Sequence, residues 1–114
     1  MAAITSGQIG SIANGALTTP TPIIPAASDT IDRSLCGPNG LLVRAITTGT
    51  STNLTVTDPG TTGLGNAGTP ATLACPASGA RMTVVPVAAA NASGQITLNW
   101  SGALTGVTYE LYRW

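Results

Sequence analysis

The sequence predicts an all-β fold: a single β-sandwich of jelly-roll type that follows an extended N-terminal arm and contains essentially no helix. The first observation behind this prediction is composition. The chain of 114 residues has 14 glycines and eight prolines but no lysine and a single glutamate, whereas helices favour Glu and Lys and are broken by Gly and Pro. The second is the abundance of threonine and valine, which favour strands. The third is a series of short segments of alternating apolar and polar residues between turns, a spacing typical of sandwiches and barrels.

Residues 1–27 are predicted to form the arm. Three prolines hold this segment extended, and its larger apolar residues follow neither a helical nor a strand period: Ile4, Ile9, Ile12, Leu17, Ile23 and Ile24. Such a segment is either a frayed terminus or a strap that lies along a partner and uses these six side chains as anchors. We favour the strap, because a disordered tail seldom contains so many Ile and Leu residues.

The sandwich is expected over residues 28–114, with strands at 30–35, 41–47, 53–57, 71–75, 81–85, 95–100 and 107–113. The strand at 41–47 is expected to be central, since both of its faces are apolar. The segments 71–75 and 81–85 are expected to pair with each other across the turn at 76–79. Residues 61–70 are expected to be a Gly-rich loop.

The inward faces of these strands follow from alternation. In the last two strands they comprise Ile96, Leu98 and Trp100, and then Val107, Tyr109 and Leu111. Tyr112 and Trp114 are expected on the outward face. Exposed aromatic residues are typical of interfaces, so a contact with another subunit or a shell is the first interpretation. A carbohydrate platform and packing of the chain's own terminus are the alternatives.

The side-chain inventory argues against an enzyme. The chain has no histidine and no lysine, which excludes a serine triad and a lysine base. Residues 63–68 match the letters G-x-G-x-x-G, but no helix is expected after them and no acidic residue follows before Glu110, so they are interpreted as loop glycines. No cofactor is expected.

A metal site is not expected either. Cys36 and Cys75 without any histidine do not make a zinc site, and they are expected to be free thiols because the chain shows no export signal. Asp29 and Asp32 lie beside Arg33 at a strand entrance. We interpret them as a turn cap with a surface ion pair, with a weak calcium site as the alternative. The same three residues are candidates for a contact with a partner.

The charges limit the classes of partner. Four arginines and four acidic residues sum to zero, so no basic patch for nucleic acid is expected. No apolar run approaches the ~20 residues of a membrane span. Near-zero net charge promotes association, which favours assembly as the function. A virion component fits a chain that is made and retained in the cytosol and leaves when the host cell lyses.

Residues 41–114 resemble small structural proteins of tailed bacteriophages, in particular capsid decoration (cement) proteins. The matching segments are LLVR at 41–44, LTVTDPG at 54–60, GTP at 68–70, GQITLNWSG at 94–102 and GVTY at 106–109. The resemblance implies a protein on the outside of the head that binds the major capsid protein, often as a homotrimer at three-fold positions, with an arm that crosses subunit boundaries. In that setting the six apolar arm residues would contact the shell. Contacts of the sandwich would involve Asp29, Asp32, Arg33, Tyr112 and Trp114. A carbohydrate-binding or adhesion module and a tail structural protein remain the alternatives.

Overall fold

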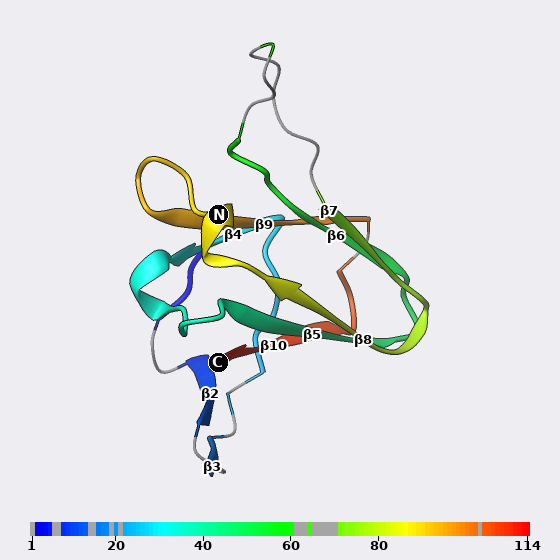
Figure 1. Ribbon diagram of the computed structural model, residues 1–114. Helices are drawn as coiled ribbons and strands as arrows, with labels where there is room; N and C mark the ends of the chain where they lie inside the picture. Colours follow the sequence, from blue (N-terminus) through cyan, green and yellow to red (C-terminus); the bar gives the residue numbers. More distant parts are fainter. Residues whose placement is uncertain are drawn as a thin grey trace.

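The computed structural model describes residues 2–5, 8–13, 16–18, 20, 22–60, 64, 71–102 and 104–114. Two five-stranded sheets pack face to face in a β-sandwich (Figure 1). Sheet A has the order β1-β4-β9-β6-β7, with strands Ala2–Ala3, Ser28–Asp32, Gln95–Ser101, Thr52–Val56 and Ala71–Cys75. Sheet B has the order β3-β2-β10-β5-β8, with strands Ala16–Thr18, Ile9–Ala13, Val107–Arg113, Leu41–Thr48 and Ser78–Val85. The all-β class predicted from the sequence is confirmed.

The inward faces of the central strands are those that alternation predicts. The core contains Ile96, Leu98 and Trp100 of β9 and Val107, Tyr109 and Leu111 of β10. In β5 the odd-numbered residues from Leu41 to Thr47 are buried, while Leu42, Arg44 and Ile46 are half-buried on the other face. Burial of this apolar surface between the two sheets is the main favourable contribution to folding.

The first sandwich strand is shorter than predicted. It ends at Asp32, and residues Arg33–Leu35 form the 3-10 turn η2 instead of continuing the strand. The carboxylate of Asp32 accepts a hydrogen bond from the Ser34 backbone N–H at 2.9 Å. This N-cap gives the Ser34 N–H a local partner in place of a neighbouring strand, and the strand therefore ends at Asp32.

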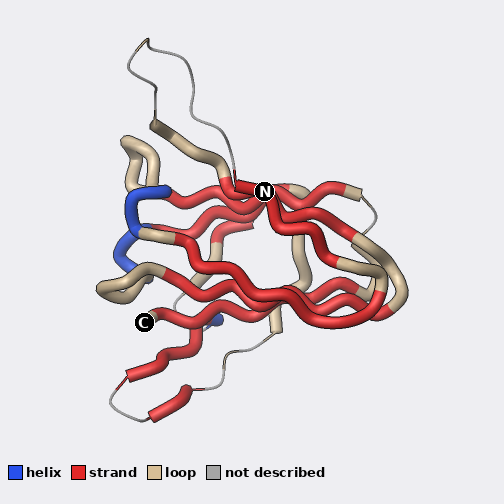
Figure 2. Tube along the Cα trace, turned by 45° about the vertical axis from the view of Figure 1, so that its right-hand side comes forward, coloured by secondary structure: helices blue, strands red, loops and turns tan. Residues whose placement is uncertain are grey.

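The predicted pairing of 71–75 with 81–85 is wrong. β7 pairs with β6 in sheet A, and β8 pairs with β5 in sheet B, so the chain crosses between the sheets at Pro76 and Ala77. Both crossing residues are tied to the end of β5. Thr47 Oγ1 donates to the Pro76 carbonyl at 2.6 Å, and the Gly49 N–H donates to the Ala77 carbonyl at 2.5 Å. The two strands therefore diverge from this connection rather than forming a hairpin (Figures 1 and 2).

The N-terminal segment is built into the sandwich, which differs from the separate arm predicted over residues 1–27. β1 pairs in parallel with β4, and β2 pairs in parallel with β10. Ile23 exchanges two backbone hydrogen bonds with Tyr109, at 2.8 and 3.0 Å. These contacts cover edges of β4 and β10 that would otherwise present unpaired backbone groups. Strands β1, β2 and β3 therefore belong to the two sheets in this structure.

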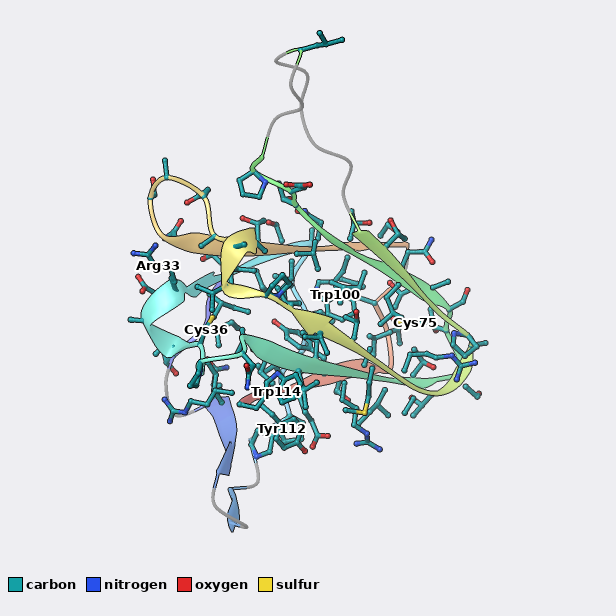
Figure 3. The ribbon with its side chains drawn as sticks, in the orientation of Figure 1. Arg33, Cys36, Cys75, Trp100, Tyr112 and Trp114 are labelled. Atoms are coloured by element: carbon teal, nitrogen blue, oxygen red, sulfur yellow. The ribbon has the colours of Figure 1, made fainter. Side chains whose placement is uncertain are left out.

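The two cysteines are free, as predicted. Figure 3 places Cys36 and Cys75 at opposite ends of the molecule. Burial raises the pKa of both thiols, which lowers the fraction present as the reactive thiolate. The predicted Gly-rich loop at 61–70, with its G-x-G-x-x-G letters, lies outside the described residues apart from Leu64.

Candidate interaction surface

The outer face of sheet B, meaning the side of β10, β5 and β8 that points away from sheet A, is the candidate functional surface. The strand register arranges nine residues of this face in three rows across the sheet. The rows are Tyr112, Leu42 and Val84; Glu110, Arg44 and Met82; and Thr108, Ile46 and Ala80. Directly opposed side chains on one face of a sheet lie close enough to contact each other, so each row forms a continuous strip.

This face is largely apolar and is not covered by other described parts of the chain. Met82 and Val84 on β8 are 53% and 49% exposed. Leu42, Ile46 and Ala80 are half-buried. Large apolar side chains gathered on one exposed face mark interaction sites more often than singly scattered ones do.

One ion pair lies in the middle row. Arg44 Nη1 and Glu110 Oε1 are 2.7 Å apart, and the hydroxyl of Tyr112 donates to the same Glu110 oxygen at 3.5 Å. A partly exposed pair of this kind contributes about 0–1 kcal/mol to stability. Its main consequence is electrostatic, because the face carries one positive and one negative charge that neutralise each other.

The two predicted aromatic contact residues lie at the end of β10. Tyr112 is half-buried on the outer face of sheet B, and Trp114 is 37% exposed immediately beyond the strand. Figure 3 shows the two residues together near the C-terminus. The backbone of Trp114 packs on the turn at residues 37–40, which precedes β5, since the Trp114 carbonyl accepts the Asn39 N–H at 2.7 Å. A Cβ added at Gly37 would collide with the Trp114 backbone.

The structure separates the three charged residues predicted to form one contact cluster. Asp32 and Arg33 are exposed, whereas Asp29 is completely buried. The interpretation of Asp29 as a surface contact residue is therefore wrong. Its position in β4 has the same inward orientation as Ile31, two residues later. The predicted turn cap at Asp32 is present, and the hydrogen bonds from Ser34 lower the pKa of its carboxyl.

Asp29 belongs to a buried polar contact that the sequence analysis did not identify. The Tyr109 hydroxyl donates to Asp29 Oδ2 at 2.5 Å, and the ring of Tyr109 lies 4.8 Å from that of Trp100. Asp29 Oδ1 and Trp100 Nε1 are buried without a hydrogen-bond partner among the described residues. Burial, together with the hydrogen bond and charge of Asp29, raises the pKa of Tyr109 well above its usual value. The sequence feature that could have identified this contact is the position of Asp29, two residues before Ile31 on the inward face of a strand.

The six apolar residues predicted to bind a shell have different environments. Ile4, Ile9 and Ile23 are buried in the core of this chain. Ile12 and Leu17 lie in β2 and β3, and their side chains are outside the described part of the structure. Ile24 is 81% exposed. It follows the Ile23–Tyr109 bridge, which places it next to Thr108 at the margin of the outer face of sheet B.

The described residues include no helix long and apolar enough to cross a membrane. Within those same ranges, no three or more His, Cys, Asp or Glu side chains gather as potential metal ligands. No family model matches the chain, and no curated protein or solved structure matches it either.

Proposed function

We propose that this chain is a non-enzymatic structural protein of a bacteriophage virion that decorates and stabilises the assembled capsid by binding across subunits of the major capsid protein. The observation that carries the proposal is the outer face of sheet B, an exposed apolar surface whose two charges neutralise each other. Such a surface suits permanent contact with a neutral protein lattice. It offers little to a charged ligand such as a nucleic acid.

The strand order supports the jelly-roll form of the sandwich. Ile23 lies antiparallel beside β10, in the position of a first strand. With it, the principal strands follow the orders Ile23-β10-β5-β8 and β4-β9-β6-β7, an arrangement that supports a jelly roll built from two Greek keys. Jelly rolls are frequent in viral capsid proteins and in lectins. The strand order is therefore compatible with both the leading proposal and the carbohydrate-binding alternative.

The binding mechanism is apolar burial repeated over many copies. Full burial of a Val, Leu, Ile or Met side chain is worth about 1.5–3 kcal/mol before the cost of ordering is subtracted. Met82 and Val84 are about half exposed before binding, so they would bury the most additional apolar area on the shell. Ile24 and Trp114 add apolar surface at the margins. A modest energy per copy is multiplied across the shell and, in the proposed homotrimer, within each decorating unit.

The test is co-assembly of the chain with the major capsid protein of its own phage, followed by electron cryomicroscopy of the shells. We expect density for this chain on the outside of the shell in a regular array. The double variant Met82→Asp/Val84→Asp should lose the array, because binding would bury two unpaired carboxylates. The matched control is Asn53→Asp/Ala74→Asp, which adds the same charge at two exposed, paired positions of β6 and β7 in sheet A and should still bind.

Two results would contradict the proposal: shells without bound chain, and equal binding by the two double variants. Electron cryomicroscopy of whole virions separates the head from the tail. Density for this chain confined to the tail would overturn the capsid assignment and support the tail structural protein.

A carbohydrate-binding module is the second candidate, supported by the exposed Trp114 next to Tyr112. The Tyr and Trp rings have apolar faces and a polar group at one end, which suits contact with a carbohydrate that is partly polar and partly apolar. Glycan-array binding that Trp114→Ala abolishes, while Met82→Asp/Val84→Asp leaves it intact, would favour this candidate over the shell protein.

A further inference from the structure

A groove of about 330 Å³ lies between the edges of the two sheets formed by β7 and β8. It is on the opposite side of the sandwich from β1 and β3, which form the other edges. Its floor and walls are mainly apolar and include Leu54, Val56, Leu73 and Val85. One end is closed where Pro76 and Ala77 join β7 to β8, and the strands diverge from there (Figures 1 and 2).

Both strands beside this groove have an unpaired edge within the described structure. β7 pairs with β6 alone and β8 with β5 alone among the described strands. β8 runs for eight residues, which is long for an edge strand. Along such an edge, alternate residues direct their backbone N–H and C=O groups outward, where they form a template for another strand.

The geometry limits what can fill the groove. A compact apolar ligand would cover backbone donors and acceptors of the edge without pairing them, and each buried unpaired group would weaken its binding. A globular partner contributes roughly 20–30 residues to a standard interface, whereas 12 of the described residues line this groove. An extended polypeptide segment avoids both difficulties, because its backbone pairs with the edge and its side chains fill the narrow space.

Two charges give the groove a polarity along its length. Asp58 is the only ionisable side chain among the described residues that line it. Asp58 follows β6, whose Val56 is paired with Ala71 at the start of β7, so it lies toward the open end. Arg81 has the same orientation on β8 as Thr83 and is nearer the closed end, where its charge acts on Cys75. An antiparallel partner of β8 with a basic residue first and an acidic residue last complements both charges.

We propose that the groove binds an extended segment of another protein, which pairs antiparallel with β8 as a sixth strand of sheet B. Alternate apolar side chains of the segment enter the groove over Leu54, Val56 and Leu73. A basic residue near its start faces Asp58, and an acidic residue near its end faces Arg81. The groove borders the outer face of sheet B along β8, and Val84 belongs to both, but its occupation does not depend on binding to a phage shell.

The test uses the purified full chain and a fluorescent peptide, acetyl-KTVTVTE-amide, in which the basic, apolar and acidic side chains share one face of an extended strand, in an anisotropy titration. We expect saturable binding. The charge-reversed peptide acetyl-ETVTVTK-amide should bind about tenfold more weakly, which corresponds to about 1.4 kcal/mol. A version of the first peptide that is N-methylated at alternate residues should not bind, because its edge-facing donors are removed. Amide hydrogen exchange should slow in β8 and not in β3.

The variant Thr83→Arg places a charged side chain in the groove and should weaken binding at least about tenfold. The control Thr108→Arg changes another half-buried threonine of sheet B, on the outer face, and should bind as the unmodified chain does. No saturable binding, equal affinity for the two charge orders, full binding by the N-methylated peptide or protection away from β8 would each overturn the proposal. The exchange and peptide comparisons use the unmodified chain, so they decide the matter even if Thr83→Arg fails to fold. Because no shell protein is present, these failures are distinct from failure of capsid binding.

Discussion

Tyr109 and Asp29 connect the two sheets through the core. Asp29 is on β4 of sheet A and Tyr109 is on β10 of sheet B, 80 residues apart in the chain, and their hydrogen bond measures 2.5 Å. A buried carboxylate is costly unless it is hydrogen-bonded, so this contact offsets part of the cost of placing an acid between the sheets. It also gives the mainly apolar sandwich a directional contact that depends on the relative position of the sheets.

Removal of this hydrogen bond should destabilise the fold. Tyr109→Phe keeps the ring against Trp100 but leaves both Asp29 oxygens without a partner, and we expect a loss of about 1.5–3 kcal/mol in the free energy of unfolding. The matched control is Tyr112→Phe, which removes only a 3.5 Å contact with Glu110 and should cost less than about 0.5 kcal/mol. Urea denaturation of both variants measures the difference. Equal losses would show that the buried bond contributes nothing particular to stability.

Alkaline pH should weaken the fold through the same residue. Burial and the neighbouring Asp29 raise the pKa of Tyr109 in the folded state, whereas a tyrosine in the unfolded chain ionises near pH 10. The contribution of Tyr109 to stability is therefore fully present below about pH 10 and is lost as the pH rises above that value. Partial burial also raises the pKa of the Cys36 and Cys75 thiols, so their contribution to stability begins a similar loss above about pH 8.5.

The free energy of unfolding should be measured across this alkaline range in a Cys36→Ser/Cys75→Ser background and in the same background with Tyr109→Phe. The decline above about pH 10 should be smaller when Tyr109 is absent. An identical decline in the two proteins would assign the pH dependence to other groups.

At the level of elements, the N-terminal strands are structural parts of this sandwich. β1 and β2 cover the edges of β4 and β10, and Ile4 and Ile9 enter the core. A partner-binding strap would show the opposite pattern, with most of its apolar residues exposed. Among the six predicted anchors whose side chains the structure describes, Ile24 fits the predicted strap, because its side chain is exposed to solvent.

Two isoleucine-to-alanine variants separate the internal and external roles of this segment. Ile9→Ala should lower the free energy of unfolding by about 2–5 kcal/mol, because it leaves a cavity beside β10. Ile24→Ala should change stability by less than about 0.5 kcal/mol, and its effect should appear in shell binding instead. Thermal or urea denaturation provides the comparison. Near-neutral Ile9→Ala would mean that the segment is detached from the sandwich in solution.

The strands that alternation identifies best are those with one face in the core. β9 and β10 have an apolar residue at every second position, so their bounds and inward faces were predicted almost residue by residue. The pairing of β7 and β8 was not. A Pro- and Gly-containing turn looks the same in sequence whether it closes a hairpin or connects two sheets. The choice depended on Thr47 and Gly49, which are distant from this turn in the sequence.

The whole molecule combines a net charge of zero with an exposed apolar face on sheet B and an open groove at the β7 and β8 edges. Neutral molecules do not repel each other at long range, so contacts between copies or with a shell are decided by short-range packing. On the outer face of sheet B, the ion pair of Arg44 and Glu110 likewise leaves no net charge. Association is therefore expected to be driven by apolar burial rather than by charge attraction.

Shell binding should accordingly depend little on ionic strength. Raising salt shortens the screening length from about 30 Å at 0.01 M to about 8 Å at 0.15 M, which weakens charge-driven binding but leaves apolar burial unchanged. We expect binding isotherms to overlap across this range and to strengthen in sulfate, which favours burial of apolar surface. A steep loss of affinity with added sodium chloride would show that charged contacts dominate.

The sequence by itself determined the class of the fold and the inward face of most strands, because a period of two is a local property of each segment. It also determined which functional groups the chain contains: there is no histidine or lysine, and the charges sum to zero. Only the tertiary structure decided which strands pair, that the N-terminal segment closes both sheets, and that Asp29 lies in the core while Asp32 caps a turn. These outcomes depend on contacts between residues far apart in the chain, such as Asp29 with Tyr109 and Ile9 with Leu111. No local pattern specifies which distant segment will supply the matching edge or buried partner.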